Sequence, residues 1–339
     1  MNLAELTTLR LGGPAGQMVE ATGEQRLVDA VAIADQAGDP ALIVAGGSNL
    51  VIADEGFPGT VILVRSRGIS VDADACSGAM VTVQAGENWD DFVSHAIGQD
   101  WVGIEALSGI PGSVGATPIQ NVGAYGQDVA QTIATVRTYD RIESKIRTFA
   151  AADCGFSYRS SRFKAEPHRY IVLSVTFQFA LGDLGAPVAY AELARILGVR
   201  AGERAPAKAV RDAVLLLRRG KGMVLDADDH DTWSAGSFFT NPLLSPEVAA
   251  SLPADAPRYG QPDGTVKTSA AWLIEHAGFG KGYGSGRAKL STKHTLALTN
   301  CGDATTADLL GLAREIRNGV ETAFGITLVN EPVLVGCNF

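Results

Sequence analysis

Positive charge is in short supply in this sequence. Of 339 residues, 28 are Lys or Arg and 37 are Asp or Glu, so the formal net charge at pH 7 is −9. Binding to nucleic acid needs Lys and Arg concentrated on one surface, and this composition argues against a nucleic-acid partner. An anionic small ligand is still compatible with it, because a local cluster of basic residues can override the overall sign.

Cysteine is also scarce. The four cysteines, Cys76, Cys154, Cys301 and Cys337, lie far apart and form no CxxC pair, which is typical of reduced thiols in a reducing compartment. The segment Met1–Arg10 has no signal-peptide pattern, and no apolar run approaches the ~20 residues of a bilayer span. We therefore expect a soluble, cytoplasmic protein with no membrane partner, and a monomer.

Familiar metal and nucleotide motifs are missing. No pair of histidines has zinc spacing. The acidic stretch Asp226–Asp231 places Asp231 and Ser237 where an EF-hand needs Gly and Glu, so we expect a solvated loop and no metal. Neither GxxxxGK(S/T) nor GxGxxG followed by an acid occurs, which excludes P-loop and Rossmann sites.

The chain is long, and nearly half of its residues are apolar. It has 339 residues, 46% of them apolar, and a chain of this length exceeds what one hydrophobic core usually supports. Changes in the pattern of expected helices and strands predict domain boundaries near residues 66 and 204. The expected domains are 1–66, 67–203 together with 322–339, and 204–321.

Hydrophobic periodicity predicts a mixture of helices and strands. The helix at 24–38 should bury Leu27, Val31, Ile33 and Ala34, and Thr305 with Asp308 resembles a capping box for a helix that follows. Other helices are expected at 206–219 and 269–277. Strands are expected at 41–45, 61–64, 70–73, 81–84, 133–139, 170–179, 295–299 and 326–335. The last strand should return to the sheet of the second domain.

Two glycine loops are candidates for binding an anion. Gly46-Gly47-Ser48-Asn49 follows an expected strand, and the second loop runs from Gly109 to Gly126. Backbone N–H groups exposed by glycine can hold an anion without a named motif. Either loop alone would be interpreted as an ordinary turn, but the pair favours a dinucleotide diphosphate held without a Rossmann unit. The third glycine-rich stretch, 278–286, is interpreted as a flexible loop.

The segment Ser234–Pro242 poses a question about Ser237. A serine can be a nucleophile, a proton donor, a phosphate ligand or a turn residue, and the GxSxG elbow that a nucleophile needs is absent here. Glu331 also stands out, since an acid within the apolar terminal strand costs free energy unless it is paired or neutral. The run Tyr158–Lys164 is basic, and a solvated loop is its simplest interpretation.

Together these motifs resemble the UDP-N-acetylenolpyruvoylglucosamine reductases, flavoenzymes of peptidoglycan precursor synthesis. The resemblance covers nearly the whole chain, from Thr7–Ala15 through both glycine loops, Tyr158-Arg159-Ser160 and Ser234–Pro242 to Glu331. It implies an α+β chain with an FAD-binding fold of the vanillyl-alcohol-oxidase (PCMH) type in two subdomains, plus a separate α/β substrate-binding domain. FAD should be held non-covalently, since no His lies in either flavin loop, and NADPH should reduce it.

The resemblance also assigns residues to roles. Ser237 becomes the proton donor to C2 of the enolpyruvyl group, while Arg159 and Glu331 stabilise the enolate-like intermediate. Glu331 can do so only when protonated or bonded through a neutral partner, so we expect a raised pKa. The residues implied to contact FAD are Gly46, Gly47, Ser48, Asn49, Ile110, Gly112, Ser113, Gly115, Ala116, Ile119, Gln120, Gly123, Tyr125 and Arg218.

Four further residues match positions that contact the UDP-sugar substrate. They are Tyr190, Lys221, Asn241 and His294. The chain departs from the family at Val333, where many members have a basic residue, and in a longer segment between Lys221 and Ser234. Two alternatives stay open, a flavin oxidoreductase acting on another substrate and a non-catalytic nucleotide-sugar-binding protein on the same scaffold.

Overall fold

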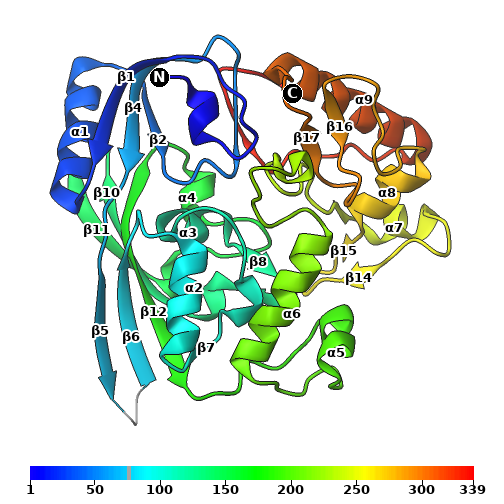
Figure 1. The fold of residues 1–339 in the computed structure, drawn as a ribbon, viewed down its shortest axis with the longest axis horizontal. Helices are drawn as coiled ribbons and strands as arrows, with labels where there is room; N and C mark the ends of the chain where they lie inside the picture. The colour runs from blue at the N-terminus through cyan, green and yellow to red at the C-terminus, as the bar shows by residue number, and fades with distance from the viewer. Residues whose placement is uncertain (75–77) are drawn as a thin grey trace. The chain divides into compact units, whose positions relative to one another are not determined.

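A computed structural model describes residues 1–74 and 78–339 (Figure 1). Cys76, one of the four expected thiols, lies outside these residues. The chain forms two compact units: unit 1 comprises Met1–Ala15, Gly47–Phe57 and Gly220–Phe339, and unit 2 comprises Gly16–Gly46 and Pro58–Arg219. Their limits do not coincide with the expected boundaries near 66 and 204.

The larger sheet of unit 2 has six strands in the order β11-β10-β12-β6-β5, with β7 paired to the end of β12. All of these pairings are antiparallel. The bounds are β5 Ile69–Asp74, β6 Gly78–Gln84, β7 Trp101–Val102, β10 Ile133–Asp140, β11 Lys145–Ala150 and β12 Tyr170–Leu181. Four expected strands, at 70–73, 81–84, 133–139 and 170–179, are thereby confirmed.

A second sheet in unit 2 has the order β1-β4-β2, formed by Ala15–Ala21, Phe57–Val64 and Ala41–Val44. Helix α1 (Glu24–Ala37) follows β1 and buries Leu27, Val31 and Ala34. Ile33 was expected on that buried side but is 66% exposed. At 100° per residue, Ile33 lies 200° around the helix from Val31, which turns it to solvent.

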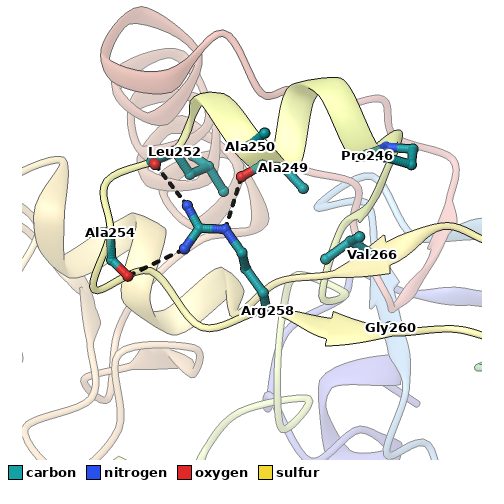
Figure 2. Close-up of a pocket in the computed structure, with 8 residues that line it drawn as sticks. All are labelled: Pro246, Ala249, Ala250, Leu252, Ala254, Arg258, Gly260 and Val266. Atoms are coloured by element: carbon teal, nitrogen blue, oxygen red, sulfur yellow. Dashed lines mark hydrogen bonds between the residues drawn. The ribbon is translucent and has the colours of Figure 1, made fainter.

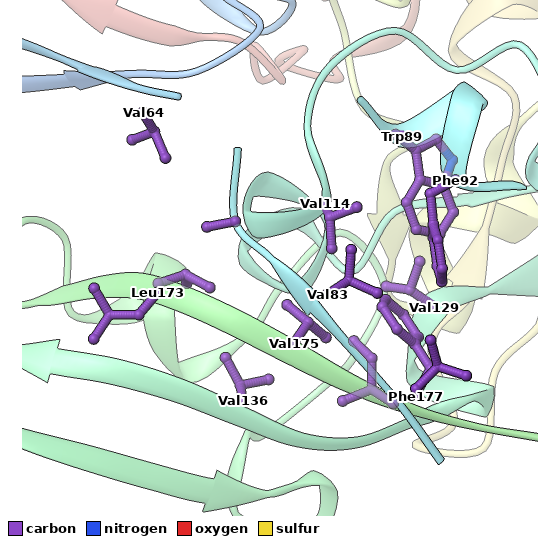
Figure 3. Close-up of a cluster of buried hydrophobic side chains, with 14 of the residues drawn as sticks. Val64, Val83, Trp89, Phe92, Val114, Val129, Val136, Leu173, Val175 and Phe177 are labelled. Carbon is purple, nitrogen blue, oxygen red and sulfur yellow. The ribbon is translucent and has the colours of Figure 1, made fainter. Parts of the chain in front are cut away.

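The core of unit 2 forms where helix α2 (Trp89–Gly98) lies against the six-stranded sheet (Figure 3). The rings of Trp89 and Phe92 are 6.1 and 5.3 Å from the ring of Phe177 on β12, measured between centroids. Val83 and Val175 belong to the same buried cluster. This packing fixes the segment that follows α2, which includes the second glycine loop.

Short elements make up the rest of unit 2, and the segments that carry candidate site residues are among them. They are η2 Glu105–Leu107, η3 Val114–Ala116, α3 Thr117–Gln120, β8 Gly123–Ala124, β9 Gln127–Asp128, η4 Val129–Gln131, η5 Ala151–Asp153, α4 Arg162–Ala165, α5 Ala191–Leu197 and α6 Ala207–Gly220. Helix α6 confirms the helix expected at 206–219.

Unit 1 joins segments from both ends of the chain. Its elements are η1 Leu3–Leu6, β3 Leu50–Ile52, η6 His230–Thr232, β13 Leu243–Leu244, α7 Pro246–Ser251, β14 Tyr259–Gly260, β15 Val266–Lys267, α8 Ala270–His276, β16 Ala288–Leu290, β17 Leu298–Asn300, α9 Thr306–Phe324 and β18 Val333–Val335. The expected capping box is confirmed at the start of α9, where Thr305 and Asp308 bond reciprocally. Across the described part of the chain, no helix has the length and apolar character needed to cross a membrane.

The end of the chain differs from expectation. The strand predicted at 326–335 is reduced to β18, which pairs in parallel with β3 of unit 1 rather than with the six-stranded sheet. The segment before it, residues 326–329, follows the cap of α9, and Ile326 and Leu328 are buried there without forming a strand. The expected strand is therefore replaced by β18 and an isolated bridge between Asn330 and Phe239.

Candidate functional site

The two glycine loops meet each other in unit 2. A Cβ atom added at Gly46 would lie 2.6 Å from the Cα of Gly112, closer than side chains pack. Gly112 has φ +123°, a region that L side chains rarely adopt. Gly115 is equally confined, because its Cβ would lie 2.5 Å from the Cβ of Ala85. Glycine is therefore required at position 46 for the two loops to approach, and at position 115 for the second loop to pass Ala85.

Ser113, at the centre of the second loop, is 5% exposed, and its Oγ has no hydrogen-bond partner within residues 1–74 and 78–339. A buried hydroxyl left in this state costs free energy that a bound polar group can recover. The close glycines and this hydroxyl suit a cofactor with a diphosphate, so the residues present fit FAD. Gly46, Gly112, Ser113, Gly115 and the adjoining Ala116 are thus brought into one region.

The later part of the second loop has unusual backbone geometry. Asn121 and Tyr125 have φ +42° and +51°, in the left-handed region. The side-chain oxygen of Gln120 accepts a bond of 2.8 Å from Lys164, and Gly123 O accepts one of 2.7 Å from Arg159. Ile119, also expected to contact FAD, packs with Ile110 against the core of unit 2.

Arg159 adopts φ +53°, which is costly for a residue with a side chain. Besides its bond to Gly123, its own carbonyl accepts a bond of 3.0 Å from the ammonium of Lys164. The neighbours Ser157 and Ser160 bond each other's backbone, closing a tight turn around it. The basic run 158–164 is therefore an ordered turn rather than the solvated loop that its composition suggested.

Arg218 lies near the end of α6 and is 8% exposed. Burial lowers its pKa to about 10, although Tyr125 and Asp90 act in the opposite direction. A buried guanidinium next to the glycine-loop residue Tyr125 is suited to an anionic group of a cofactor. This places Arg218 with the residues expected to contact FAD.

Gly47, Ser48 and Asn49 continue the first loop into unit 1. A Cβ at Gly47 would lie 1.8 Å from the carbonyl oxygen of Leu6, and Gly47 O accepts a bond of 3.2 Å from Thr8 N. The amide of Asn49 reaches Glu331 O at 3.5 Å. The first loop is therefore fixed by the N-terminal segment on one side and approaches a proposed catalytic residue on the other.

Ser237 and Glu331 come together in unit 1. Phe238 N donates to Leu296 O at 2.7 Å, and Phe238 O accepts from Glu331 N at 2.8 Å. Gly236, with φ +71°, makes the turn that precedes Ser237. Glu331 is half-buried and lies two residues before β18, so it is not inside a strand as predicted. Residues that are 94 positions apart are thus adjacent through the backbone.

Phe238 and Phe239 anchor the Ser237 segment. Each is 1% exposed, and their ring centroids are 5.7 and 5.9 Å from that of Phe339. Edge-to-face and tilted arrangements of this kind are the favourable geometries for aromatic rings. This buried packing can fix the position of the Ser237 hydroxyl, and the effect of the aromatic pair on turnover remains a prediction.

The residues expected to bind substrate divide between the units. Tyr190 of unit 2 precedes α5, is 43% exposed and meets the ring of Tyr125 edge-on at 5.4 Å. In unit 1, burial and the nearby charges of Lys221 and Lys281 lower the pKa of His294 to about 4. A neutral imidazole beside two ammonium groups is a reasonable site for an anion such as a diphosphate.

Asn241 already uses its side-chain oxygen. That oxygen accepts a bond of 3.0 Å from Ala270 N at the start of α8, which leaves the amide N–H groups as its remaining donors. Val333, where the family resemblance expects a basic residue, begins β18 and is 45% exposed.

The acidic loop at 226–231 is more ordered than expected. Asp231 accepts a bond of 2.8 Å from Thr292 N, and Asp229 pairs with Lys293. The hydroxyl of Thr232 donates to Asp226 O at 2.7 Å. The carboxylate of Asp226 also accepts a bond of 3.0 Å, from Asp228 N. Three of the carboxylates are therefore engaged in fixing the loop, while Asp228 is exposed to solvent.

A groove of unit 1 beside α7 is lined by small and apolar residues around Arg258 (Figure 2). The guanidinium donates to the carbonyls of Ala249, Ala254, Ala256, Leu252 and Pro253. Arginine has five N–H donors, and these five acceptors occupy them. Arg258 therefore stabilises the end of α7 and is not suited to binding an anion.

Two acidic residues of unit 2 that hold separate segments together were missed from the sequence. Asp90 accepts bonds of 2.6 Å from both Gly109 N and Arg211, which ties the start of the second glycine loop to α6. Burial would raise the pKa of Asp90, but the bonds from Arg211 and Gly109 outweigh it and lower the pKa. Glu105, in η2, is fully buried. The only signal for it in the sequence is an acid within the apolar stretch 101–107.

Comparison with known proteins first defines the class. Residues 15–143 match the family described as "FAD binding domain", in agreement with the paired glycine loops. The chain is thus an FAD-dependent oxidoreductase, and the expected α+β fold class with an FAD-binding part is confirmed. Residues 228–335 match "UDP-N-acetylenolpyruvoylglucosamine reductase, C-terminal domain".

Relatives along the full length define the family. A UDP-N-acetylenolpyruvoylglucosamine reductase of Cutibacterium acnes is 58% identical, over 99% of this chain and 89% of its own. One of Streptomyces coelicolor is 56% identical, over 98% of this chain and 89% of its own. The chain belongs to the UDP-N-acetylenolpyruvoylglucosamine reductase family. A crystal structure of such a reductase from Thermus caldophilus shares the fold, with a TM-score of 0.68 at 23% identity over 99% of this chain and 97% of that one.

Proposed function

We propose that this chain reduces UDP-N-acetylglucosamine enolpyruvate to UDP-N-acetylmuramate in the cytoplasm, with NADPH as the reductant. The observation that carries the proposal is the backbone hydrogen bond from Glu331 N to Phe238 O, which holds the segment of Ser237 against that of Glu331. This backbone bond brings the segment of a serine beside that of a glutamate in a family of FAD-dependent enzymes, which supports a shared role for the two residues. In this proposal, unit 2 mainly holds FAD and residues 204–321 mainly hold the sugar nucleotide.

The residues that would hold FAD are those of the two glycine loops and Arg218. The close approach of Gly46 to Gly112 and the buried hydroxyl of Ser113 support this assignment. Held there non-covalently, FAD would supply the hydride chemistry, with NADPH as the source and transfer from its N5 to C3 of the enolpyruvyl group. Both glycine loops are closely approached by neighbouring segments, so the diphosphate would enter a site that is largely formed.

Ser237 would deliver the proton to C2 of the substrate. Charge develops on the substrate carboxylate as C3 is reduced, and Arg159 and Glu331 are placed in the proposal to stabilise it. The strained backbone of Arg159, held by Lys164 and Gly123, suits a group whose position matters more than its flexibility. Glu331 would act as a hydrogen-bond donor, which requires a pKa raised above its ordinary value.

The sugar nucleotide would be held by Tyr190, Lys221, Asn241 and His294. Lys221 supplies charge, and the amide N–H groups of Asn241 are donors whose position is set by the bond of its oxygen to α8. His294 is neutral at pH 7, because its pKa is about 4. It can therefore donate one hydrogen bond to a phosphate oxygen without carrying a charge.

A Ser237→Ala variant separates the two half-reactions. Reduction of the flavin by NADPH should proceed as in the wild type, because the hydroxyl has no part in it. Oxidation of the reduced flavin by the enolpyruvyl substrate should slow by about 10²–10⁴-fold, the usual cost of losing a general acid. Stopped-flow absorbance at the flavin band measures both steps, and an equal loss in both would refute the role of Ser237.

A further inference from the structure

Glu105 is a fully buried carboxylate in unit 2, outside every role assigned so far. It accepts three hydrogen bonds, from Gly103 N at 2.7 Å, Gln127 Nε2 at 2.8 Å and Ala186 N at 2.5 Å. The oxygen of Gln127 in turn accepts from Ala106 N at 2.8 Å, which fixes the orientation of its amide. Three separate segments of the chain are thus joined at one side chain.

The backbone has made room for this carboxylate. A Cβ atom added at Gly185 would lie 2.6 Å from Oε1 of Glu105 and 2.9 Å from its Cδ. Gly185 does not have a positive φ, so its lack of a side chain is explained by the approach of Glu105 rather than by backbone conformation. The opposite edge of this segment bonds to residues 202–205, through Gly185 N to Ala205 O and Val188 N to Glu203 O.

The segments joined by Glu105 lead to two tyrosines. Gln127 follows Tyr125 by two residues, and Ala186 precedes Tyr190 by four. Between them, a Cβ at Gly126 would lie 3.0 Å from the Cβ of Ala189, so the two segments touch. The rings of Tyr125 and Tyr190 meet edge-on with an interplanar angle of 90°. Glu105 therefore joins the segment that contains Tyr125 to the segment that contains Tyr190, through its bonds to Gln127 and Ala186.

We propose that Glu105 is a positioning residue for Tyr190, which sets the substrate-binding position of that tyrosine by holding the segment before it against the segment of Tyr125. A buried carboxylate facing N–H donors from three segments fixes their spacing better than apolar contacts, because each bond has a preferred length and direction. The inference rests on the proposed role of Tyr190 in binding the sugar nucleotide.

A double-mutant cycle tests the inference. Glu105→Gln keeps one acceptor oxygen but places an amide NH₂ group against an N–H donor, and it should raise KM for the enolpyruvyl nucleotide about tenfold. The rate of flavin reduction by NADPH should change less than about twofold, because that step does not involve Tyr190. In a Tyr190→Ala background, Glu105→Gln should add no further increase in KM, since both act through the same ring.

The outcomes distinguish this inference from the proposed function. If Tyr190→Ala raises KM and Glu105→Gln does not, or if the two effects multiply, Glu105 does not act through Tyr190. If Tyr190→Ala leaves KM unchanged, the substrate role of Tyr190 is wrong. Hydrogen exchange at Ala186 N then decides the matter for Glu105. Faster exchange in the Glu105→Gln holoenzyme supports only the holding of the Tyr190 segment by Glu105, and an unchanged rate overturns that as well.

Glu203→Gln is the matched control. Glu203 belongs to the strand-like stretch that bonds the other edge of the same segment, but its carboxylate pairs at the surface with Arg200. Its replacement makes the same chemical substitution as Glu105→Gln and leaves the three buried bonds intact. We expect KM, flavin reduction and exchange at Ala186 to match the wild type, and a KM increase in this control equal to that of Glu105→Gln would also overturn the inference.

Discussion

Glycines at positions that cannot accommodate a side chain were the easiest functional residues to predict from the sequence. Gly46, Gly112 and Gly115 lie in loops that were expected to bind a dinucleotide because runs of glycine expose backbone N–H groups. A Cβ would collide at Gly46 and at Gly115, and Gly112 has φ +123°. Ser113 was included only by its place in the motif, and its buried hydroxyl supports that choice. The requirement is local, so a local pattern could reveal it.

Gly46→Ala should weaken FAD binding. Its Cβ would approach the backbone of Gly112, which is not a flexible side chain that can move aside. Flavin content after purification should fall, and titration of the apoprotein with FAD should give a higher Kd by about tenfold or more. Gly98→Ala in α2 is the control, because no atom lies within 4 Å of the added methyl group and Ala favours a helix. Equal FAD affinity in both variants would contradict the proposal that the approach of Gly46 to Gly112 forms part of the FAD site.

Residues whose role depends on distant partners were harder to predict. Glu331 was singled out as an acid in an apolar strand, but the same pattern in 101–107 was passed over at Glu105. Its partners Gln127 and Ala186 are 22 and 81 positions away. A sequence indicates that a buried acid needs partners and does not say which residues supply them. Contacts of this kind are known only once the chain is folded.

Elements with strong end signals were predicted well. The Thr305–Asp308 box marked the start of α9 because both groups of the cap are encoded within four residues. Strand β18 was predicted too long and in the wrong sheet, since its partner β3 is 283 positions earlier in the chain. Hydrophobic alternation indicates that a segment is buried and does not identify the strand with which it pairs.

Thr305→Ala should destabilise unit 1 by about 1 kcal/mol, the usual value of an N-cap side chain. The hydroxyl accepts the bond from Asp308 N, and the Asp308 carboxylate bonds back to Thr305 N at 2.9 Å. Thr322→Ala in the same helix is the control, because its exposed hydroxyl bonds only to the carbonyl of Asn318. The free energy of unfolding in urea should fall for the first variant and stay within about 0.5 kcal/mol for the second. Equal losses would mean that the box does not stabilise α9.

At the scale of the whole molecule, the chain passes between the two units several times. Residues 1–66 were predicted as one domain, yet they are divided between units 1 and 2. A boundary predicted from the pattern of helices and strands assumes that a domain is one continuous segment. The first glycine loop crosses between the two units, because Gly46 belongs to unit 2 and Gly47 to unit 1. When the chain crosses from one unit to the other within a single motif, the amino-acid composition does not change at the crossing point.

The pH dependence of stability depends on His294. Burial, with the charges of Lys221 and Lys281, lowers its pKa from 6.5 to about 4 in the folded protein. Between these two values the unfolded chain binds the proton and the folded protein does not, so acid favours unfolding. The contribution of His294 to the free energy of unfolding is complete above pH 6.5 and should fall by at most about 1.4 kcal/mol per pH unit below it.

His294→Gln should remove this dependence. Urea unfolding of the wild type and the variant, measured from pH 7.5 to pH 4.5, should give a difference that is constant above pH 6.5 and shifts in favour of the variant as the pH falls. Carboxylates titrate mainly below this window, and their contribution is common to both proteins. A difference that stays the same over the whole range would show that the imidazole is protonated equally in the folded and unfolded chains. In that case His294 would not be the neutral donor that the proposed diphosphate site requires.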